Sequence, residues 1–246
     1  DVSSWSVYEW ITAVLPLQTD HYWFATAYVL MFMLSPVLAA GVRQLSKKQL
    51  EITIGVLLVY FCVFKSINPI LLATDNYGYD YPWFICLFLM AAYIRRHGIP
   101  FLERKGMALL VYVLSSLGIF GISATAALIS RRFGALEYYM DMPYCYNYFL
   151  TLIASVSLFY VFKQMEVREG NIVRLICRMA PYTFGVYLLH ENMAVRDLWP
   201  KWLGVEGVKD SLLFVPQMLF AVVVVFGFGI IVDFLRKKVF ELVMRK

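Results

Sequence analysis

The chain consists of long apolar runs separated by short polar segments. Seven runs can be distinguished, at residues 22–40, 51–66, 81–94, 107–129, 146–162, 179–199 and 212–235. About 20 apolar residues suffice to cross the roughly 30 Å hydrocarbon core of a bilayer as a helix. The pattern therefore predicts an all-α, polytopic membrane protein with about seven transmembrane helices, preceded by a short interfacial helix within residues 6–17.

The third run is unusually short, and the seventh run contains glycines that bear on helix packing. The third run has only 14 residues, which rise about 21 Å, so its helix either begins earlier or crosses a thin region of the membrane. In the seventh run we expect Gly227 and Gly229 to lie at a helix contact, because small residues let helix backbones approach closely in lipid.

Basic residues are distributed unevenly between the two sides of the predicted membrane. Along alternating loops, one side carries 15 lysines and arginines and the other carries six, and Arg178 lies within a run. Cytoplasmic loops of membrane proteins are enriched in Lys and Arg. We therefore expect the N-terminus outside and the C-terminus in the cytoplasm.

Aromatic residues gather on the predicted outer side. All six tryptophans and many tyrosines lie on or near it, mixed with Asp, Glu and Asn in the same loops. This mixture suits a sugar, because rings stack on the apolar faces of a sugar and carboxylates accept its hydroxyl protons. The alternative is a one-sided belt of interfacial aromatic residues.

The composition agrees with a membrane protein and excludes several other classes. The 246 residues are 61% hydrophobic, with a mean hydropathy of +0.67. The net charge of +5 lies in loops between the runs, so it does not indicate nucleic-acid binding. The four cysteines show no metal-ligand or disulfide spacing, and we expect no metal. Without repeats or low-complexity tracts, residues 1–246 are interpreted as a single membrane-embedded domain.

The sixth run is the most informative part of the chain, because it carries ionisable residues inside an apolar segment. Each of His190, Glu191, Arg196 and Asp197 would cost about 2.5–3.5 kcal/mol at the centre of a bilayer, so we expect them to face a cavity or a partner. Helical spacing places a polar stripe on one face of this helix: Thr183, Tyr187, His190, Ala194 and Asp197.

The depth of His190 follows from the length of this run. If Arg178 and Trp199 mark the two interfaces, His190 lies about 18 Å above the inner one. An imidazole beside a carboxylate at this depth is a candidate proton-transfer centre. The alternative is a helix that ends near His190, with an outer loop after it. Because residues 179–189 alone are too short to span, the longer helix is favoured.

Three further residues are candidates for the same site. His21 opens the first run just ahead of Trp23, and its alternative role is structural. Lys65 lies near the outer end of the second run. Its ammonium group either snorkels outward to the interface or supplies positive charge to the cavity of His190.

Two segments resemble a known family. The first comprises residues 21–36, His-Tyr-Trp-Phe-Ala-Thr-Ala-Tyr-Val-Leu-Met-Phe-Met-Leu-Ser-Pro, with Ser-Lys-Lys-Gln at 46–49. The second, about 150 residues later, is Thr-Phe-Gly-Val-Tyr-Leu-Leu-His at 183–190. Both resemble the integral-membrane acyltransferase-3 family, which includes the O-acetyltransferases of bacterial surface polysaccharides.

The resemblance implies an activity and its partners. Members of the family move an acyl group, usually acetyl, from cytoplasmic acyl-CoA to a hydroxyl of a glycan or similar acceptor at the outer face of the bacterial plasma membrane, without a bound cofactor. A base, either His190 or a histidine of an absent helix, would take the proton of the acceptor hydroxyl, and Glu191 would orient the imidazole or bind substrate. The candidate substrate contacts are Thr183, Tyr187, His21, Trp23, Lys65, Arg196 and Asp197.

The sequence departs from the family pattern at its start. The first helix of the family carries a basic residue followed by an essential histidine, and no such helix is found here. We therefore expect that membrane helices outside this chain complete the protein. Two other functions remain open: a transporter or flippase of a lipid-linked glycan, which fits proline-broken spans with intramembrane charge, and a non-catalytic membrane scaffold.

The basic residues of one predicted cytoplasmic loop are candidates for binding the phosphates of CoA. They are Arg95, Arg96, Arg104 and Lys105. The alternative is that they only mark the cytoplasmic side of the membrane.

Overall fold

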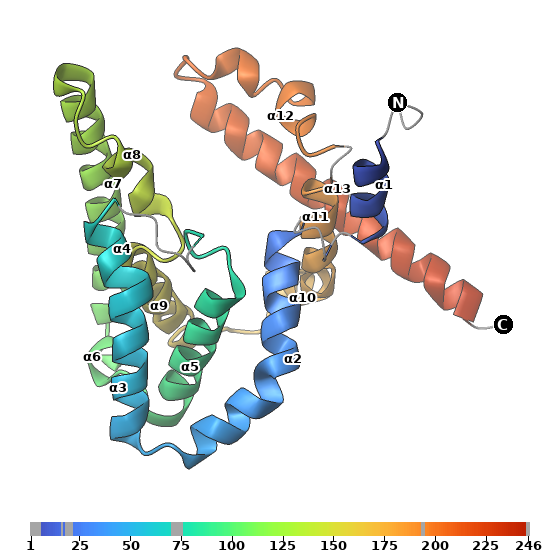
Figure 1. The fold of residues 1–246 in the computed structure, drawn as a ribbon. Helices are drawn as coiled ribbons and strands as arrows, with labels where there is room; N and C mark the ends of the chain where they lie inside the picture. Colours follow the sequence, from blue (N-terminus) through green and yellow to red (C-terminus); the bar gives the residue numbers. More distant parts are fainter. Residues whose placement is uncertain (1–5, 16, 18–21, 70–75, 193–194, 245–246) are drawn as a thin grey trace. The chain divides into compact units, whose positions relative to one another are not determined.

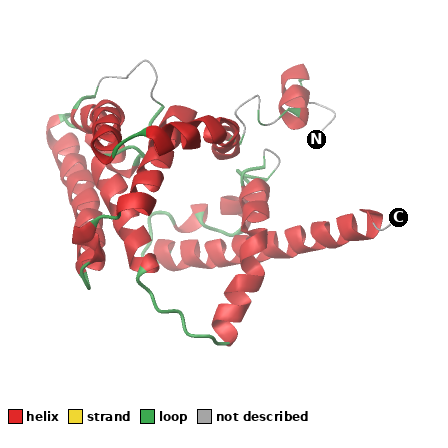
Figure 2. Ribbon diagram, turned by 90° about the horizontal axis from the view of Figure 1, so that it is seen from below, coloured by secondary structure: helices red, strands yellow, loops and turns green. Residues whose placement is uncertain are grey.

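The computed structural model describes residues 6–15, 17, 22–69, 76–192 and 195–244, and in these ranges the chain forms helices and loops without a strand (Figure 2). The chain divides into two compact units, Asp1–Met165 and Glu166–Lys246, which are described separately. Whether both act as one domain stays a prediction.

Six helical segments of the described chain are long and apolar enough to cross a membrane: Trp23–Gln44, Lys47–Ile67, Met107–Phe133, Tyr138–Lys163, Asn171–His190 and Phe214–Met244. The remaining expected span corresponds to α5 (Tyr81–His97). Its 17 residues rise about 25 Å, slightly less than the thickness of the hydrocarbon core. The prediction of an all-α polytopic membrane protein is confirmed, and its orientation stays a prediction. The short helix expected near the start is α1 (Val7–Val14).

The first unit is built around α5. Its neighbours α2 (Trp23–Gln44) and α3 (Lys47–Leu58) both pack on α5, and α7 (Met107–Phe133) packs along α9 (Phe149–Lys163) (Figure 1). After α3 follow one turn of π-helix, Val59–Val63, and α4 (Phe64–Ile67). Two short helices, α6 (Pro100–Glu103) and α8 (Tyr138–Asp141), contact α7, and a 3₁₀ turn, Met142–Tyr144, leads toward α9.

The core of the first unit lies along the inner faces of these helices. On α5, Trp83 and Cys86 pack with Cys62 and Leu152, and Leu89 belongs to a neighbouring cluster. Many large apolar side chains on the outer faces are exposed, as expected for surfaces that contact lipid rather than water.

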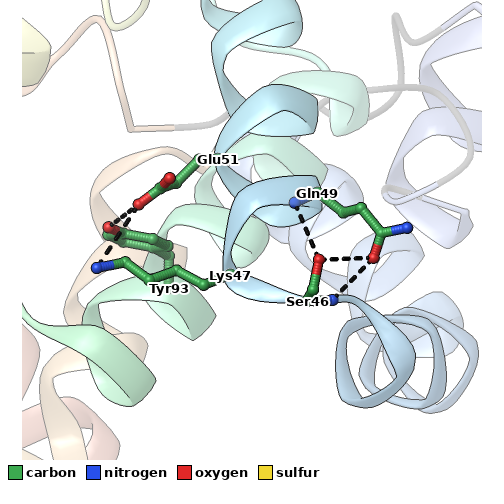
Figure 3. Close-up of polar contacts among 5 residues, drawn as sticks. All are labelled: Ser46, Lys47, Gln49, Glu51 and Tyr93. Carbon is green, nitrogen blue, oxygen red and sulfur yellow. Dashed lines mark hydrogen bonds and ion pairs between the residues drawn. The ribbon is translucent and has the colours of Figure 1, made fainter.

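The turn between α2 and α3 is fastened locally by a capping box. The hydroxyl of Ser46 accepts from the backbone N–H of Gln49 at 3.3 Å, and the Gln49 side-chain oxygen accepts from the backbone N–H of Ser46 at 2.9 Å (Figure 3). These reciprocal bonds satisfy donors that the first turn of a helix leaves open. In the same region, the hydroxyl of Tyr93 on α5 donates to Glu51 at 2.7 Å, and Lys47 lies 3.8 Å from the same carboxylate oxygen.

The second unit contains α10 (Asn171–Met179), a 3₁₀ turn (Ala180–Tyr182), α11 (Thr183–His190), α12 (Trp199–Trp202), a second 3₁₀ turn (Glu206–Val208) and α13 (Phe214–Met244). Within it, α11 packs against α13 (Figure 1).

Two glycines allow the close approach of α11 and α13. A Cβ on Gly185 of α11 would overlap the Cβ and Cγ of Asp233, and a Cβ on Gly229 of α13 would lie 2.9 Å from the Cα of Val186. The expected helix contact at Gly229 is therefore confirmed. The same expectation for Gly227 is wrong, because a Cβ there meets nothing within 4 Å.

Candidate functional site

The helix that carries the histidine ends at His190. Glu191 leaves helical geometry, with φ −86° and ψ 1°, and the backbone N–H of Asn192 bonds the carbonyl of Leu189 at 3.2 Å. The prediction of one continuous helix over 179–199 is therefore wrong, and the alternative that it ends near His190 is correct. The segment is still long enough to span, because α10 extends it at its N-terminal end, back to Asn171.

This boundary changes where the candidate residues lie along the helical segment. The segment Asn171–His190 has 20 residues, enough to cross the hydrocarbon core in about 30 Å. His190 lies at one end of this segment, and its depth in the membrane stays a prediction. Glu191, Arg196 and Asp197 lie beyond that end, where charged groups do not incur the full cost of burial in lipid.

A cavity of about 470 Å³ lies within the second unit and is bordered by α11, α12 and α13. From α11 it is lined by Thr183, Tyr187 and His190, the first part of the polar stripe that helical spacing predicted. Of the other two predicted members of the stripe, Asp197 is not among the lining residues that the structure describes. Ala194 lies outside the described residues, and the side chain of Asp197 is 79% exposed in a turn.

The walls of this cavity are mostly apolar, with a few polar groups. Val186, Leu203, Val222 and Phe226 are among the lining side chains. The indole N–H of Trp199 is buried and has no hydrogen-bond partner among the described residues. Buried donors normally have a partner, so a ligand that offers an acceptor would satisfy it.

His190 joins the apolar cavity to a charged surface. Its side chain is 49% exposed, and its Nδ1 lies 3.4 Å from Oε1 of Glu191. Consecutive residues of a helix point about 100° apart, but Glu191 has left the helix and turns back to its neighbour. The other oxygen of Glu191 lies 3.7 Å from Arg196, whose Nε is 3.6 Å from Asp197. Glu191 thus lies beside the imidazole, and its predicted role, to orient the imidazole or to bind substrate, stays a prediction.

Lys65 lies in the first unit, and its side chain is almost completely buried at 1% exposure. The interpretation that it snorkels to the interface is therefore wrong. Its Nζ lies 4.2 Å from the centroid of the Tyr77 ring, a cation–π contact. The π-turn Val59–Val63 just before it explains the difference. One extra residue per turn rotates the side chains that follow by about 100° relative to a continuous α-helix.

Of the other candidates of the first unit, Trp23 is described by the structure and His21 is not. The ring of Trp23 packs edge-on against Tyr79, with centroids 4.6 Å apart, and lies 5.3 Å from Tyr146. His21 lies outside the described residues.

The basic residues considered for CoA phosphates have mixed structural roles. Arg96 donates to the carbonyls of Val42 and Leu45, at 2.6 and 3.5 Å, and so caps the C-terminus of α2. Arg95 borders an apolar groove of about 590 Å³ between α5 and α9. Neither observation tests CoA binding, which stays a prediction.

Asp233 is a buried carboxylate that the hydrophobic pattern did not single out. It is 7% exposed in α13, packs against Gly185, and accepts from Nε of Arg236 at 2.6 Å. The signal for it was a single Asp inside the otherwise apolar seventh run. Asp233 packs against Gly185 of the Thr-Phe-Gly motif and so helps to position α11.

Within the described part of the chain, no three His, Cys, Asp or Glu side chains are grouped as they would be around a metal ion.

A comparison with models of protein families found a match that covers most of the sequence. The model described as "Acyltransferase domain", that of the acyltransferase-3 family, matches residues 1–234. Searches of curated proteins and of solved structures found no significant match. The match covers nearly the whole chain, including residues 183–190, several of which line the cavity described above. The chain therefore belongs to the acyltransferase-3 family of membrane acyltransferases.

Proposed function

We propose that the protein is an O-acyltransferase that moves an acyl group, most simply acetyl, from cytoplasmic acyl-CoA to a hydroxyl group of a cell-surface glycan. Family membership supports acyl transfer in general. The observation that carries the finer proposal is His190, which lines an apolar cavity and whose exposed side chain contacts Glu191. A base in that position can meet an acyl group and a hydrated acceptor together.

In this mechanism the acyl group lies in the cavity of about 470 Å³, against its apolar walls. His190 takes the proton of the acceptor hydroxyl, and the hydroxyl oxygen attacks the carbonyl carbon of the acyl group, which is carried either as the CoA thioester or as an acyl intermediate formed from it with release of CoA. The N–H of Trp199 is a donor for the negative charge that develops on the carbonyl oxygen. In direct transfer the C–S bond then breaks and the CoA thiolate recovers the proton from the imidazolium. An acyl intermediate instead releases the group that carried the acyl chain, and that group takes the same proton. The products in both cases are an ester and free CoA.

Inverted membrane vesicles test this function directly. They expose the cytoplasmic face, so labelled acetyl-CoA is added outside while oligosaccharide acceptors are trapped inside. We expect base-labile label on the trapped sugar in vesicles that contain the chain and none in vesicles without it. Label that stays on CoA in every preparation would contradict acyl transfer. Movement of lipid-linked glycan without ester formation would favour the flippase alternative.

The sidedness assumed here makes a separate prediction about thiol labelling. With the N-terminus outside, Cys145 faces the outside, and the exposed position Lys105 faces the cytoplasm. In a Cys177→Ser background, a membrane-impermeant maleimide is expected to label Cys145 on intact cells. A Lys105→Cys variant that also carries Cys145→Ser is expected to react only after permeabilisation. The reverse pattern would show the opposite orientation.

A further inference from the structure

A second cavity, of about 410 Å³, lies in the first unit and differs in chemistry from that of His190. It is lined by three tyrosines and two carboxylates: Tyr77, Tyr79, Tyr138, Glu137 and Asp141. Its volume is in the range of small-molecule sites, about 300–1,000 Å³. None of the mechanism above uses these residues.

One wall of this cavity is fixed to the transmembrane helices by hydrogen bonds. The hydroxyl of Tyr138 donates to the carbonyl of Lys65 at 2.7 Å, and the hydroxyl of Tyr139 donates to the carbonyl of Ile67. From α7, Ser123 donates to the carbonyl of Met140 at 2.6 Å. Helix α8 is thus held against both α4 and α7. A wall held in place in this way loses little freedom when a ligand binds.

The opposite wall is held by a strained turn. Tyr77 has a φ of +56°, which is uncommon for a residue with a Cβ, and its ring lies over the buried ammonium of Lys65. Gly78, at φ +84°, has no room for a side chain, because a Cβ there would lie 2.9 Å from the backbone nitrogen of Asn147. Non-glycine residues in this backbone region cluster at functional sites.

Packing also fixes the ring of Tyr79. It meets Trp23 edge-on with centroids 4.6 Å apart and meets Tyr146 edge-on at 5.1 Å. Burial, with smaller contributions from Tyr146 and Cys145, raises the pKa of the Tyr79 phenol, so its hydroxyl keeps its proton and remains a donor. The cavity therefore presents rigid rings, the hydroxyl donor of Tyr79 and carboxylate acceptors.

This set of groups selects the chemical class of a ligand. Among the described residues no Lys or Arg lines the cavity, so Glu137 and Asp141 would repel an anion. One face of Tyr77 is already occupied by the ammonium of Lys65, which disfavours a second cation on that ring. A neutral sugar suits both the tyrosine rings and the carboxylates of this cavity, because its C–H faces stack on rings while its hydroxyls donate to carboxylates.

We propose that this cavity, defined by Tyr77, Tyr79, Tyr138, Glu137 and Asp141, is a sugar-binding subsite that holds the acceptor glycan. The role as acceptor subsite rests on the proposed acyl transfer, whereas sugar binding itself does not.

Cys145 lines the same cavity and provides a probe for it. In membranes that contain the Cys177→Ser chain, the rate of maleimide labelling at Cys145 is measured with neutral monosaccharides, with glycerol and with choline. We expect at least one sugar to slow labelling about tenfold at ten times its dissociation constant. Glycerol and choline are expected to have no effect. A thiol introduced by Lys105→Cys, outside the cavity, is expected to react at the same rate with and without sugar.

Isosteric variants test whether the two carboxylates bind the sugar or only maintain the structure of the cavity. Asp141→Asn and Glu137→Gln are expected to abolish protection by sugar, measured for each variant as the ratio of its own labelling rates with and without sugar, because the loss of a nearby charge can also alter the reactivity of Cys145. Glu169→Gln, which alters an exposed carboxylate before α10, is expected to retain full protection. Protection by choline alone, or by no sugar of the panel, would overturn the proposal. Protection without acyl transfer in the vesicle assay would uphold this subsite and count against the proposed function instead.

Discussion

Replacing His190 by Gln is expected to lower the rate of acyl transfer by about 10²–10⁴-fold, the usual contribution of a general acid–base group. Glutamine keeps a polar side chain of similar reach but cannot exchange a proton with the acceptor. The variant should therefore lower kcat with little change in the KM for acyl-CoA, because the cavity walls remain. Initial rates in the vesicle assay measure both constants.

The matched control is His97→Gln, which changes a histidine of the first unit whose ring lies beside Tyr93. It should transfer acyl groups at the unaltered rate. Glu191→Gln should lose about tenfold, at the low end for a hydrogen bond to a charged group, because its contact with His190 is long at 3.4 Å. A His190→Gln variant that works as well as the unaltered chain would remove the imidazole from the mechanism.

Gly185→Ala is expected to destabilise the second unit by about 1–3 kcal/mol, as overpacking of a close-packed contact does. The added methyl group would overlap Asp233 close to its backbone, where the side chain cannot swing away and also holds Arg236. Gly229→Ala should act in the same direction, because the methyl group would meet the backbone of Val186 at 2.9 Å. Thermal unfolding in one fixed detergent measures the effect as a lower midpoint.

Gly227→Ala provides the control on the same helix. Its Cβ meets nothing within 4 Å, and alanine favours a helix by up to about 1 kcal/mol over glycine. This variant should be as stable as the unaltered chain or slightly more so. Equal loss of stability in Gly185→Ala and Gly227→Ala would mean that helix flexibility, rather than contact between α11 and α13, requires these glycines.

The positions of most membrane spans, the sixth excepted, and part of the site followed from local pattern. Apolar run length located the helices, since transfer of side chains into lipid depends mainly on each segment's own composition. The i, i+4, i+7 spacing of Thr183, Tyr187 and His190 placed them on one face, and the structure has all three lining one cavity. The family was likewise identifiable from the motifs themselves.

Other features depend on which backbone lies next to which. The sequence by itself determined that the chain forms apolar helices and that one of them carries a histidine on the same face as Thr183 and Tyr187. Only the tertiary structure decided that α11 ends at His190, that a π-turn directs Lys65 inward, and that Gly229 rather than Gly227 meets a neighbour. Hydrophobic periodicity reports the preference of each segment for lipid or water, whereas close packing depends on partners distant in the chain. The tyrosine cavity likewise draws its two walls from segments about 60 residues apart, which no local pattern could bring together.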